Sequence, residues 1–412
     1  MLSTTVLRSM IGVDRRTVIV KTRFDESRGA FIIAVRQRQS KKPRCGVCGA
    51  LAPRYDQGEG KRLWRCVDLG TTMAFLEADA PRVSCKEHGV VVASVPWARH
   101  DARFTYAYED TCAWITAHAP ASTVAVLMRT TWRSVTAIVE RVVAELAGRT
   151  DLLDGLRRIG IDEIAHRKGQ RYITCVIDHD TGRLVWAREG RDMATLEVFF
   201  DHLGKDRSKL LKQVSCDGAE WIHAVVRARA KRARICLDPF HVMQWASKAL
   251  DEVRREMWRG LRGTPAAEAI KGSRWALLTS PDNQTTDHQG TLVGISVTNK
   301  RLYRAYLLKE QLRLAMAVKG HKGKTLLAAW LRWAKRCRIP SFVKLAKTIE
   351  NYLGLIHNTM TTKLSNARSE ATNTHLRVLT RRSYGFHSPE ALIAMAMLTR
   401  GGLCPPLPGR AS

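Results

Sequence analysis

The order of strands and helices in residues 157–240 restricts the fold more than any other feature of this chain. RRIGIDEIA is an apolar strand with Asp162 near its end, and RYITCVIDHD and RLVWAREG form a hairpin around a turn at 180–182. The helical segment DMATLEVFFDHL precedes a strand that ends at Asp217, and a helix through AEWIHAVVRARAKR precedes the strand RARICLDPF. The pattern therefore predicts an α/β fold with the order βββ-α-β-α-β.

Two carboxylates stand at strand ends in this pattern. The order is that of a ribonuclease H-like core, in which adjacent parallel strands can bring Asp162 and Asp217 within a few ångström of each other. Two like charges in an apolar setting are unfavourable without cations, and Mg²⁺ prefers oxygen ligands. A pair of such ions would activate a water or hydroxyl and stabilise the leaving oxygen in phosphodiester cleavage. The alternative is that both residues only form turns at strand ends.

A third acidic ligand has two candidates late in the chain. Glu350 falls in KTIENYLGLIHN, an amphipathic pattern that is also typical of a solvated helix face. Glu370 falls in SNARSEATNTHLRVLTRRSYGF, a polar and arginine-rich segment that also contains Asn366 and Asn373. Such surroundings suit a site that meets phosphates. The residue pattern by itself leaves the choice between the two glutamates open.

The N-terminal 97 residues are predicted to form a small β-rich module that holds a metal. Two pairs have the spacing of zinc ligands: Cys45-x-x-Cys48 and Cys85-x-x-His88. The 36 residues between the pairs exceed the usual spacing in zinc fingers, but a β-hairpin within them would bring the pairs together. Cys66 is a competing ligand, and the alternative to zinc is a set of reduced structural thiols.

Residues 98–150 change from strand to helical periodicity. YEDTCAWITAHA, STVAVLMR and WRSVTAIVERVVAEL form three short helices, with Ser122 as the expected N-cap of the second. Three helices with tight turns indicate a helix-turn-helix unit, whose last helix enters the major groove of DNA. We expect Arg129, Trp132 and Arg133 to contact DNA there.

The charge of the chain points to a polyanionic partner. Its 412 residues include 68 basic and 38 acidic ones, a formal charge of +30, and both residues 1–160 and residues 161–412 are basic. Nucleic acid is the commonest such partner, and the alternatives are a generic basic protein or a binder of membrane surfaces. Residues 246–345, with 20 basic and 7 acidic residues, read as a helical insertion rather than a loop.

Membrane and secretory segments are not expected. No apolar run approaches the roughly 18 residues that a membrane helix needs, and the N-terminus lacks the apolar core of a secretory signal. Ten cysteines in a protein that reads as intracellular favour metal ligation over disulfides for those that cluster.

Several short motifs together carry a family resemblance. GIDE (160–163), SCDGAEW (215–221), LDPFHV (237–242) and SNARSEATNTHLRVLTRRSYGF (365–386), with the cysteine module and the helix-turn-helix before them, resemble the ISL-three family of bacterial insertion-sequence transposases. The resemblance covers nearly the whole chain. It implies a DDE enzyme with a ribonuclease H-like core and a helical insertion before the last acid.

The resemblance also implies roles for individual residues. Asp162 and Asp217 become the first two acids and Glu370 the third, together holding Mg²⁺ or Mn²⁺. The zinc ligands that the resemblance favours are Cys45, Cys48, Cys85 and His88. His241 belongs to a D-x-x-H feature and would position DNA or assist proton transfer, the alternative being a hydrogen bond within the core.

These expectations combine into one organisation. The predicted parts are a zinc module (1–97), a helix-turn-helix (98–150), the first part of the core (151–245), a basic all-α insertion (246–345) and the last part of the core (346–412). Arg368, Arg381 and Arg382 are expected to contact phosphates, with a solvated basic face as the alternative.

The expected function is that of a DNA transposase that binds terminal inverted repeats and catalyses strand cleavage and strand transfer. Double-stranded DNA is the partner, and pairing two ends requires a homodimer or larger assembly. The expected place is the bacterial cytoplasm, at the nucleoid. The alternatives are an inactive DNA-binding regulator and a junction nuclease without strand transfer.

Overall fold

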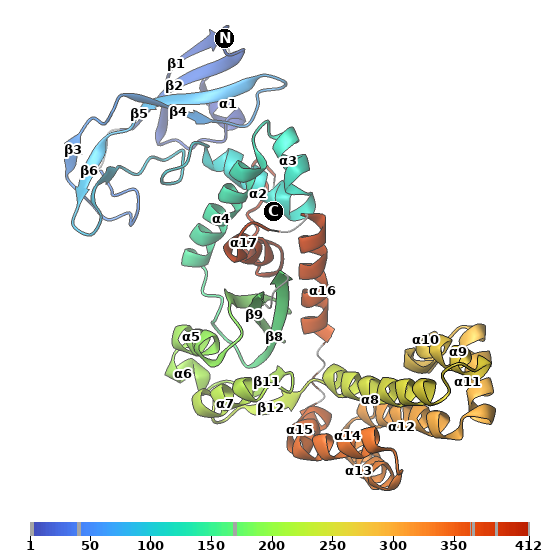
Figure 1. The fold of residues 1–412 in the computed structure, drawn as a ribbon. Helices are drawn as coiled ribbons and strands as arrows, with labels where there is room; N and C mark the ends of the chain where they lie inside the picture. Colours follow the sequence, from blue (N-terminus) through green and yellow to red (C-terminus); the bar gives the residue numbers. More distant parts are fainter. Residues whose placement is uncertain are drawn as a thin grey trace. The chain divides into compact units, whose positions relative to one another are not determined.

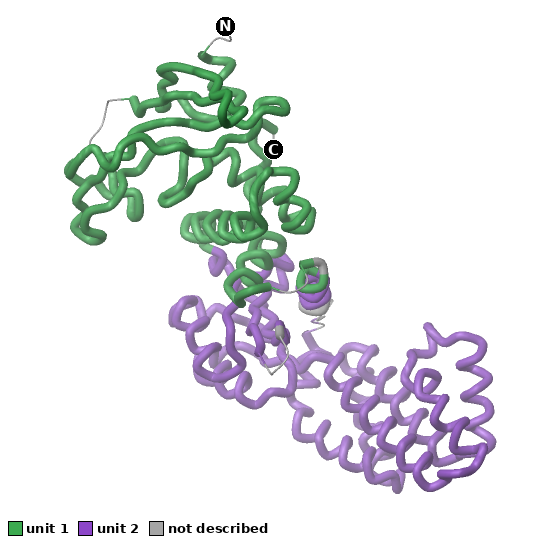
Figure 2. Tube along the Cα trace, turned by 45° about the horizontal axis from the view of Figure 1, so that its top comes forward, with its two compact units in different colours: residues 1–151, 379–412 green, residues 152–378 purple. Residues whose placement is uncertain are grey.

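The computed structural model describes residues 4–38, 43–167, 171–362, 364, 367–383 and 386–410. The side chains of Arg167, Ala367, Ser369, Glu370 and Arg382 lie outside the described part. The chain forms two compact units: residues 1–151 together with 379–412, and residues 152–378 (Figure 2).

The first unit begins with a four-stranded sheet. Its elements are α1 (Thr4–Met10), β1 (Thr17–Asp25), β2 (Ala30–Gln37), β4 (Lys61–Arg65) and β5 (Met73–Asp79). The strand order is β1-β2-β5-β4, with β2 and β5 parallel and the outer pairs antiparallel. Ile33, Trp64, Leu76 and Trp97 are buried between this sheet and its neighbours. Alternation of apolar and polar residues in 15–40 explains the antiparallel pair β1–β2, whereas no periodicity in the sequence indicates α1.

A second, smaller sheet lies in the same N-terminal region. It consists of β3 (Arg54–Asp56), β6 (Arg82–Cys85) and β7 (Gly89–Val92), all antiparallel. The strands β3 and β7 are three and four residues long and were not expected, because so short a segment carries almost no periodicity.

The rest of the first unit is helical. Its elements are α2 (Tyr106–His118), α3 (Ala121–Leu127), α4 (Trp132–Arg149) and α17 (Pro389–Arg400), and α17 packs against α2 and α4 (Figure 1). The prediction of Ser122 as an N-cap was wrong. The helix α3 begins at Ala121 after Pro120, whose φ of −61° already suits a helix start. The Thr131 hydroxyl caps α4 by accepting from the Ser134 N–H at 3.1 Å.

The second unit is built on a five-stranded sheet. Its elements are β8 (Arg158–Arg167), β9 (Arg171–Asp178), β10 (Leu184–Glu189), α5 (Met193–Leu203), α6 (Lys205–Ser208), β11 (Gln213–Cys216), α7 (Glu220–Arg229) and β12 (Arg234–Leu237). The strand order is β10-β9-β8-β11-β12. The first three strands are antiparallel to one another, and β8, β11 and β12 are parallel. The chain order is that read from the sequence, with the single turn α6 added.

A long helical stretch follows β12. Its elements are α8 (Pro239–Gly260), α9 (Pro265–Gly272), α10 (Arg274–Leu278), η1 (Pro281–Asn283), α11 (Thr286–Thr298), α12 (Lys300–Ala317), α13 (Gly320–Arg336), α14 (Pro340–Asn351) and α15 (Leu353–Thr362). These helices share a core that includes Leu250, Trp330 and Phe342.

The helix α15 brings the chain back to the sheet. The Asn358 amide donates to the Ile235 carbonyl at 2.9 Å, and the Thr359 hydroxyl donates to the Leu237 carbonyl at 2.7 Å. The helix α16 (Ala367–Arg382) follows and runs from the second unit into the first. Within the part of the chain that the structure describes, no helix is long and apolar enough to cross a membrane.

Candidate active site and metal centre

The register of the parallel strands brings Asp162 and Asp217 to the same level. Ser215 lies opposite Gly160 in the β8–β11 pair, and extending this register by two residues sets Asp217 opposite Asp162. Both acids therefore lie at the same end of the parallel strands, with Asp217 one residue beyond the end of β11.

Asp238 extends this row on the third parallel strand. Cys216 lies opposite Leu237 in the β11–β12 pair, and the Asp238 N–H donates to the Cys216 carbonyl at 2.9 Å. The Asp238 carboxylate is 3% exposed and caps α8 by accepting from the Phe240 N–H at 3.0 Å. In the first turn of α8, His241 Nε2 lies 3.9 Å from Asp238 Oδ2. The predicted site residue His241 thus stands beside a buried acid at the end of the sheet.

Asp162 is held by two donors. The backbone N–H of Glu163 donates to Oδ1 at 2.8 Å, and the Asn373 amide on α16 donates to Oδ2. Burial is the main influence on the Asp162 carboxyl and raises its pKa; the hydrogen bond from Asn373 and the charge of His241 oppose this, and the charge of Asp238 adds to it. Negative charge here is unfavourable without a compensating cation.

The loop after β11 is fixed around Asp217. The Ala219 N–H donates to Asp217 Oδ1 at 2.9 Å, and the Tyr352 hydroxyl donates to the Gly218 carbonyl at 3.0 Å. A Cβ at Gly218 would lie 2.8 Å from the Trp245 ring, so only glycine allows this close approach. This contact explains the glycine of the SCDGAEW motif.

Glu163 is a further acid of the site that sequence reasoning missed. It pairs with Arg191, and its second carboxylate oxygen, Oε1, is buried without a hydrogen-bond partner in the described part of the chain. Burial raises the pKa of Glu163 to about 7, and the charge of Asp217 is the second contribution. The available signal was an acid inside an otherwise apolar strand.

The helix α16 is attached to the sheet of the second unit at two points. Arg368 donates to the carbonyl oxygens of His179 and Asp180 in the β9–β10 turn, the latter at 2.6 Å, and Asn373 reaches Asp162. Glu370 lies in α16 between these two anchors, but its side chain is outside the described part.

Two other late candidates have described side chains, Glu350 and Arg381. Glu350 on α14 pairs with Lys335 on α13 and is 40% exposed, as expected for a solvated face. Arg381 is exposed on α16, and the side chain of Arg382 lies outside the described part.

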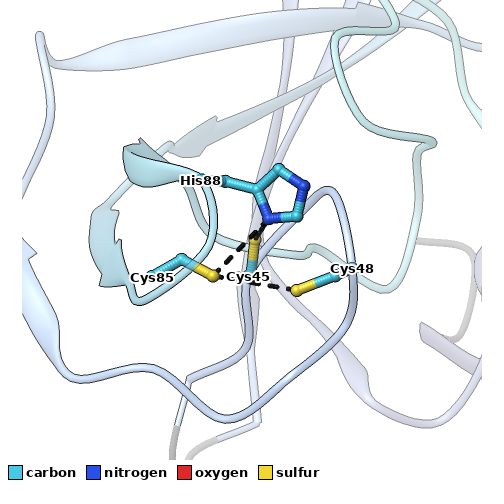
Figure 3. Close-up of side chains that lie close together, drawn as sticks. All are labelled: Cys45, Cys48, Cys85 and His88. Atoms are coloured by element: carbon cyan, nitrogen blue, oxygen red, sulfur yellow. Dashed lines mark hydrogen bonds between the residues drawn. The ribbon is translucent and has the colours of Figure 1, made fainter.

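The cysteine module brings together the four predicted metal ligands, Cys45, Cys48, Cys85 and His88 (Figure 3). Their ligand atoms all lie within 4.8 Å of one another. Cys48 Sγ is 3.7 Å from Cys85 Sγ, and His88 Nδ1 is 3.6 Å from Cys85 Sγ. The hydrogen bond from His88 lowers the pKa of the Cys85 thiol to about 6. Three sulfurs and one imidazole are a donor set that fits tetrahedral Zn²⁺.

Cys66 is not part of this centre. It is fully buried in the hydrophobic cluster that contains Trp64 and Trp97, and burial raises its pKa to about 12. A thiol in such a setting stays protonated and does not ligate a metal. Cys66 is therefore a structural residue.

The turn between α3 and α4 presents the three residues that the sequence assigned to DNA contact. Arg129 has a φ of 49°, and its guanidinium lies 3.5 Å from Asp68. Trp132, at the start of α4, is 40% exposed and stacks on His387 with ring centroids 4.6 Å apart. The Arg133 guanidinium lies 5.4 Å from the centroid of the Trp132 ring. The N-terminal end of α4 is thus an exposed aromatic and basic surface.

Three protein-family models match the chain in order. Residues 41–88 match the zinc-finger of transposase IS204/IS1001/IS1096/IS1165, and residues 93–143 match the helix-turn-helix domain of transposase family ISL3. Residues 159–396 match a model of this family described as a transposase.

Two curated relatives are similar over nearly their whole length. The transposase for insertion sequence element IS1557 of Mycobacterium tuberculosis is 47% identical, and the match covers 98% of this chain and 97% of the relative. The transposase for insertion sequence element IS1001 of Bordetella parapertussis is 24% identical over 90% of this chain and 92% of the relative.

Proposed function

The chain belongs to the ISL3 family of insertion-sequence transposases, and we propose that it cuts and joins DNA strands at a DDE-type site formed by Asp162, Asp217 and Glu370. The observation that supports the proposal is the register of the parallel strands, which brings the first two acids to the same end of the sheet. Glu370 precedes Asn373 by three residues in α16, so the two positions share a side of that helix. Since the Asn373 amide bonds to Asp162, that side of α16 is the one beside the first acid.

We further propose that the second unit is a ribonuclease H-like core interrupted by an all-α insertion. The strand order β10-β9-β8-β11-β12, with three antiparallel strands followed by parallel ones, supports the core. The helices between Pro239 and Thr362 lie between the second and third acids and support the insertion. A separate helical core within this stretch is consistent with an added domain rather than a loop.

The three acids are suited to Mg²⁺ or Mn²⁺ because the ligand atoms that they offer are all carboxylate oxygens. When bound, two such ions would activate the attacking oxygen and stabilise the leaving one. The chain's own groups hold the ligands in place: Asn373 orients Asp162, and the N–H of Ala219 orients Asp217. We assign His241, beside Asp238, to positioning DNA or moving a proton at the scissile phosphate.

The first unit would recognise the transposon ends. We propose that α4 enters the major groove, with Arg129, Trp132 and Arg133 at the DNA, and that Zn²⁺ holds the small module in shape. Arg381 and Arg382 remain candidates for phosphate contacts. Arg368 is better explained as the residue that fastens α16 to the β9–β10 turn, since two carbonyls accept from its guanidinium.

Transposition pairs two ends, so we infer a dimer or larger assembly on DNA, acting in the bacterial cytoplasm at the nucleoid. This last inference follows from the location of the DNA substrate.

A test of the site compares two substitutions in the full chain. Asp217→Asn is expected to lower the rate of Mg²⁺-dependent strand cleavage by about a thousandfold or more, since metal ions supply several kcal/mol of transition-state stabilisation. Glu350→Gln is the matched control and is expected to keep the wild-type rate, because Glu350 pairs with Lys335. Full activity in Asp217→Asn would refute the assignment. Joined products separate a transposase from a nuclease, and binding without cleavage by the wild type would favour a regulator.

A further inference from the structure

Five arginines from distant parts of the first unit line one hollow. It has a volume of about 840 Å³, and the arginines are Arg15, Arg16, Arg38, Arg44 and Arg149. They come from the segment before β1, the end of β2, the segment before the metal centre and the last turn of α4. All other residues that line the hollow are uncharged. The fold thus gathers like charges that lie more than a hundred residues apart in sequence.

Neighbouring acids compensate only part of this charge. Arg16 pairs with Asp14, and Arg149 pairs with Glu145. Arg15 and Arg38 have no acidic partner among the residues that the structure describes. Five guanidinium groups against two carboxylates leave about three positive charges facing one space. Such a concentration of cations attracts a polyanion.

We propose that this arginine hollow binds the phosphate backbone of the DNA end that the helix-turn-helix reads. The inference rests on the proposed function and adds a second contact surface to it. Guanidinium groups suit phosphate oxygens because their planar fork donates two parallel hydrogen bonds. Arg44 directly precedes the metal ligand Cys45 and Arg149 is the last residue of α4, so the hollow is formed by parts of both the cysteine module and the helix-turn-helix.

The length of α4 sets the spacing of the two contacts. The helix has 18 residues from Trp132 to Arg149, which corresponds to about 27 Å at the helical rise of roughly 1.5 Å per residue. Arg149, in the hollow, and Trp132 therefore stand at opposite ends of α4. Phosphate contacts fix the register of a protein on DNA but do not read its sequence.

The experiment uses the full chain with Arg15→Ala and Arg38→Ala combined. Binding is measured at a series of salt concentrations, on a duplex that carries the terminal repeat and on a scrambled duplex. Loss of two phosphate contacts is expected to reduce the slope of log affinity against log salt by about 1.8, which amounts to about 60-fold weaker binding near 0.1 M salt. Both duplexes are expected to lose affinity equally, because phosphate contacts do not read sequence.

Two controls accompany the variant. Arg54→Ala with Arg103→Ala removes the same charge from exposed residues of the same unit that do not line the hollow, and is expected to keep the wild-type slope. Arg15→Lys with Arg38→Lys keeps the charge and is expected to restore most of the slope. Unchanged zinc content and melting temperature check that the double alanine variant is folded.

Two results would overturn the inference: an unchanged salt slope, and a loss of affinity confined to the terminal-repeat duplex. The proposed function is tested separately by Mg²⁺-dependent cleavage of the terminal-repeat duplex by the wild type. If the wild type neither binds nor cleaves, the proposed function fails. If the wild type cleaves but the slope is unchanged in the variant, only the arginine hollow is refuted.

Discussion

Replacing Asn373 by alanine tests whether α16 positions the first acid. The Asn373 amide donates to Asp162 Oδ2 across 211 residues of sequence, and Asn373 is 9% exposed. The other carboxylate oxygen of Asp162 keeps its hydrogen bond from the Glu163 N–H in the variant. The substitution therefore removes one of the two donors that fix the orientation of the carboxylate.

Two independent estimates give the size of the effect. A hydrogen bond to a charged group contributes about 1.5–3 kcal/mol, which corresponds to about 10- to 150-fold in an equilibrium constant. Partners that orient a metal ligand typically contribute about 10- to 100-fold in metal affinity or activity. We therefore expect Asn373→Ala to raise the Mg²⁺ concentration for half-maximal cleavage by about 10- to 100-fold.

The assay is single-turnover cleavage of a terminal-repeat duplex at increasing Mg²⁺. The rate at saturating Mg²⁺ is expected to recover to within a few-fold of the wild type, because the three proposed acids remain. Thr374→Ala is the control, since Thr374 is the exposed neighbour of Asn373 on α16. A lower rate at saturating Mg²⁺ with unchanged half-saturation would refute the reasoning. Asn373 would then seat the helix without orienting Asp162.

Three further predictions concern the metal centre, the sheet and the DNA contact. The wild type is expected to hold about one zinc ion per chain, and Cys48→Ser is expected to lose this ion and, with it, binding to the transposon end. The reason is that structural zinc contributes on the order of 10 kcal/mol to the folding of such a module. Cys66→Ala is the control and is expected to keep its zinc, so equal zinc contents in the two variants would contradict the four-ligand centre. Burial lowers the pKa of His179 to about 4, so the unfolded chain binds a proton first and stability falls as pH drops from 6.5 towards 4. Between pH 7 and pH 5 the free energy of unfolding is expected to fall by up to about 2 kcal/mol from this cause. Urea unfolding of His179→Gln at both pH values is expected to show no such fall. The same pH dependence in the wild type and the variant would exclude His179 as the source. Arg133→Ala is expected to reduce the preference for the terminal repeat over a scrambled duplex by about 1–3 kcal/mol in competition binding, and an equal loss on both duplexes would mean a phosphate contact instead.

Much of the fold could be predicted because the information is local. Buried strands such as β9 contain nearly continuous apolar runs, and helices such as α4 show their period over many residues. The metal ligands were predictable for a related reason, since Cys45 with Cys48, and Cys85 with His88, each have a spacing that a single loop can present to one ion. These elements and ligands depend little on the rest of the chain.

The features that sequence reasoning missed depend on contacts between distant segments. Arg368 is predicted from its arginine-rich segment to contact phosphate, and its hydrogen bonds to carbonyls of the β9–β10 turn, more than 180 residues earlier, left no trace in that segment. In the sequence Glu163 is only the residue after Asp162; its ion pair with Arg191 is visible in the structure alone. The prediction of Ser122 as the N-cap of α3 was wrong because the helix begins at Ala121, directly after Pro120, so that Ser122 already lies inside the helix. The hydrophobic periodicity of a single segment does not reveal contacts between distant segments.

The third acid shows how a distant contact changes an inference. From sequence, Glu350 and Glu370 were both plausible, and only family resemblance favoured the second. The side chain of Glu350 is committed to Lys335 on the neighbouring helix. The helix that carries Glu370 is the one whose Asn373 bonds to Asp162, and the two positions lie one turn apart. The hydrogen bond from Asn373 to Asp162 is thus the structural observation that supports the proposal of Glu370 over Glu350.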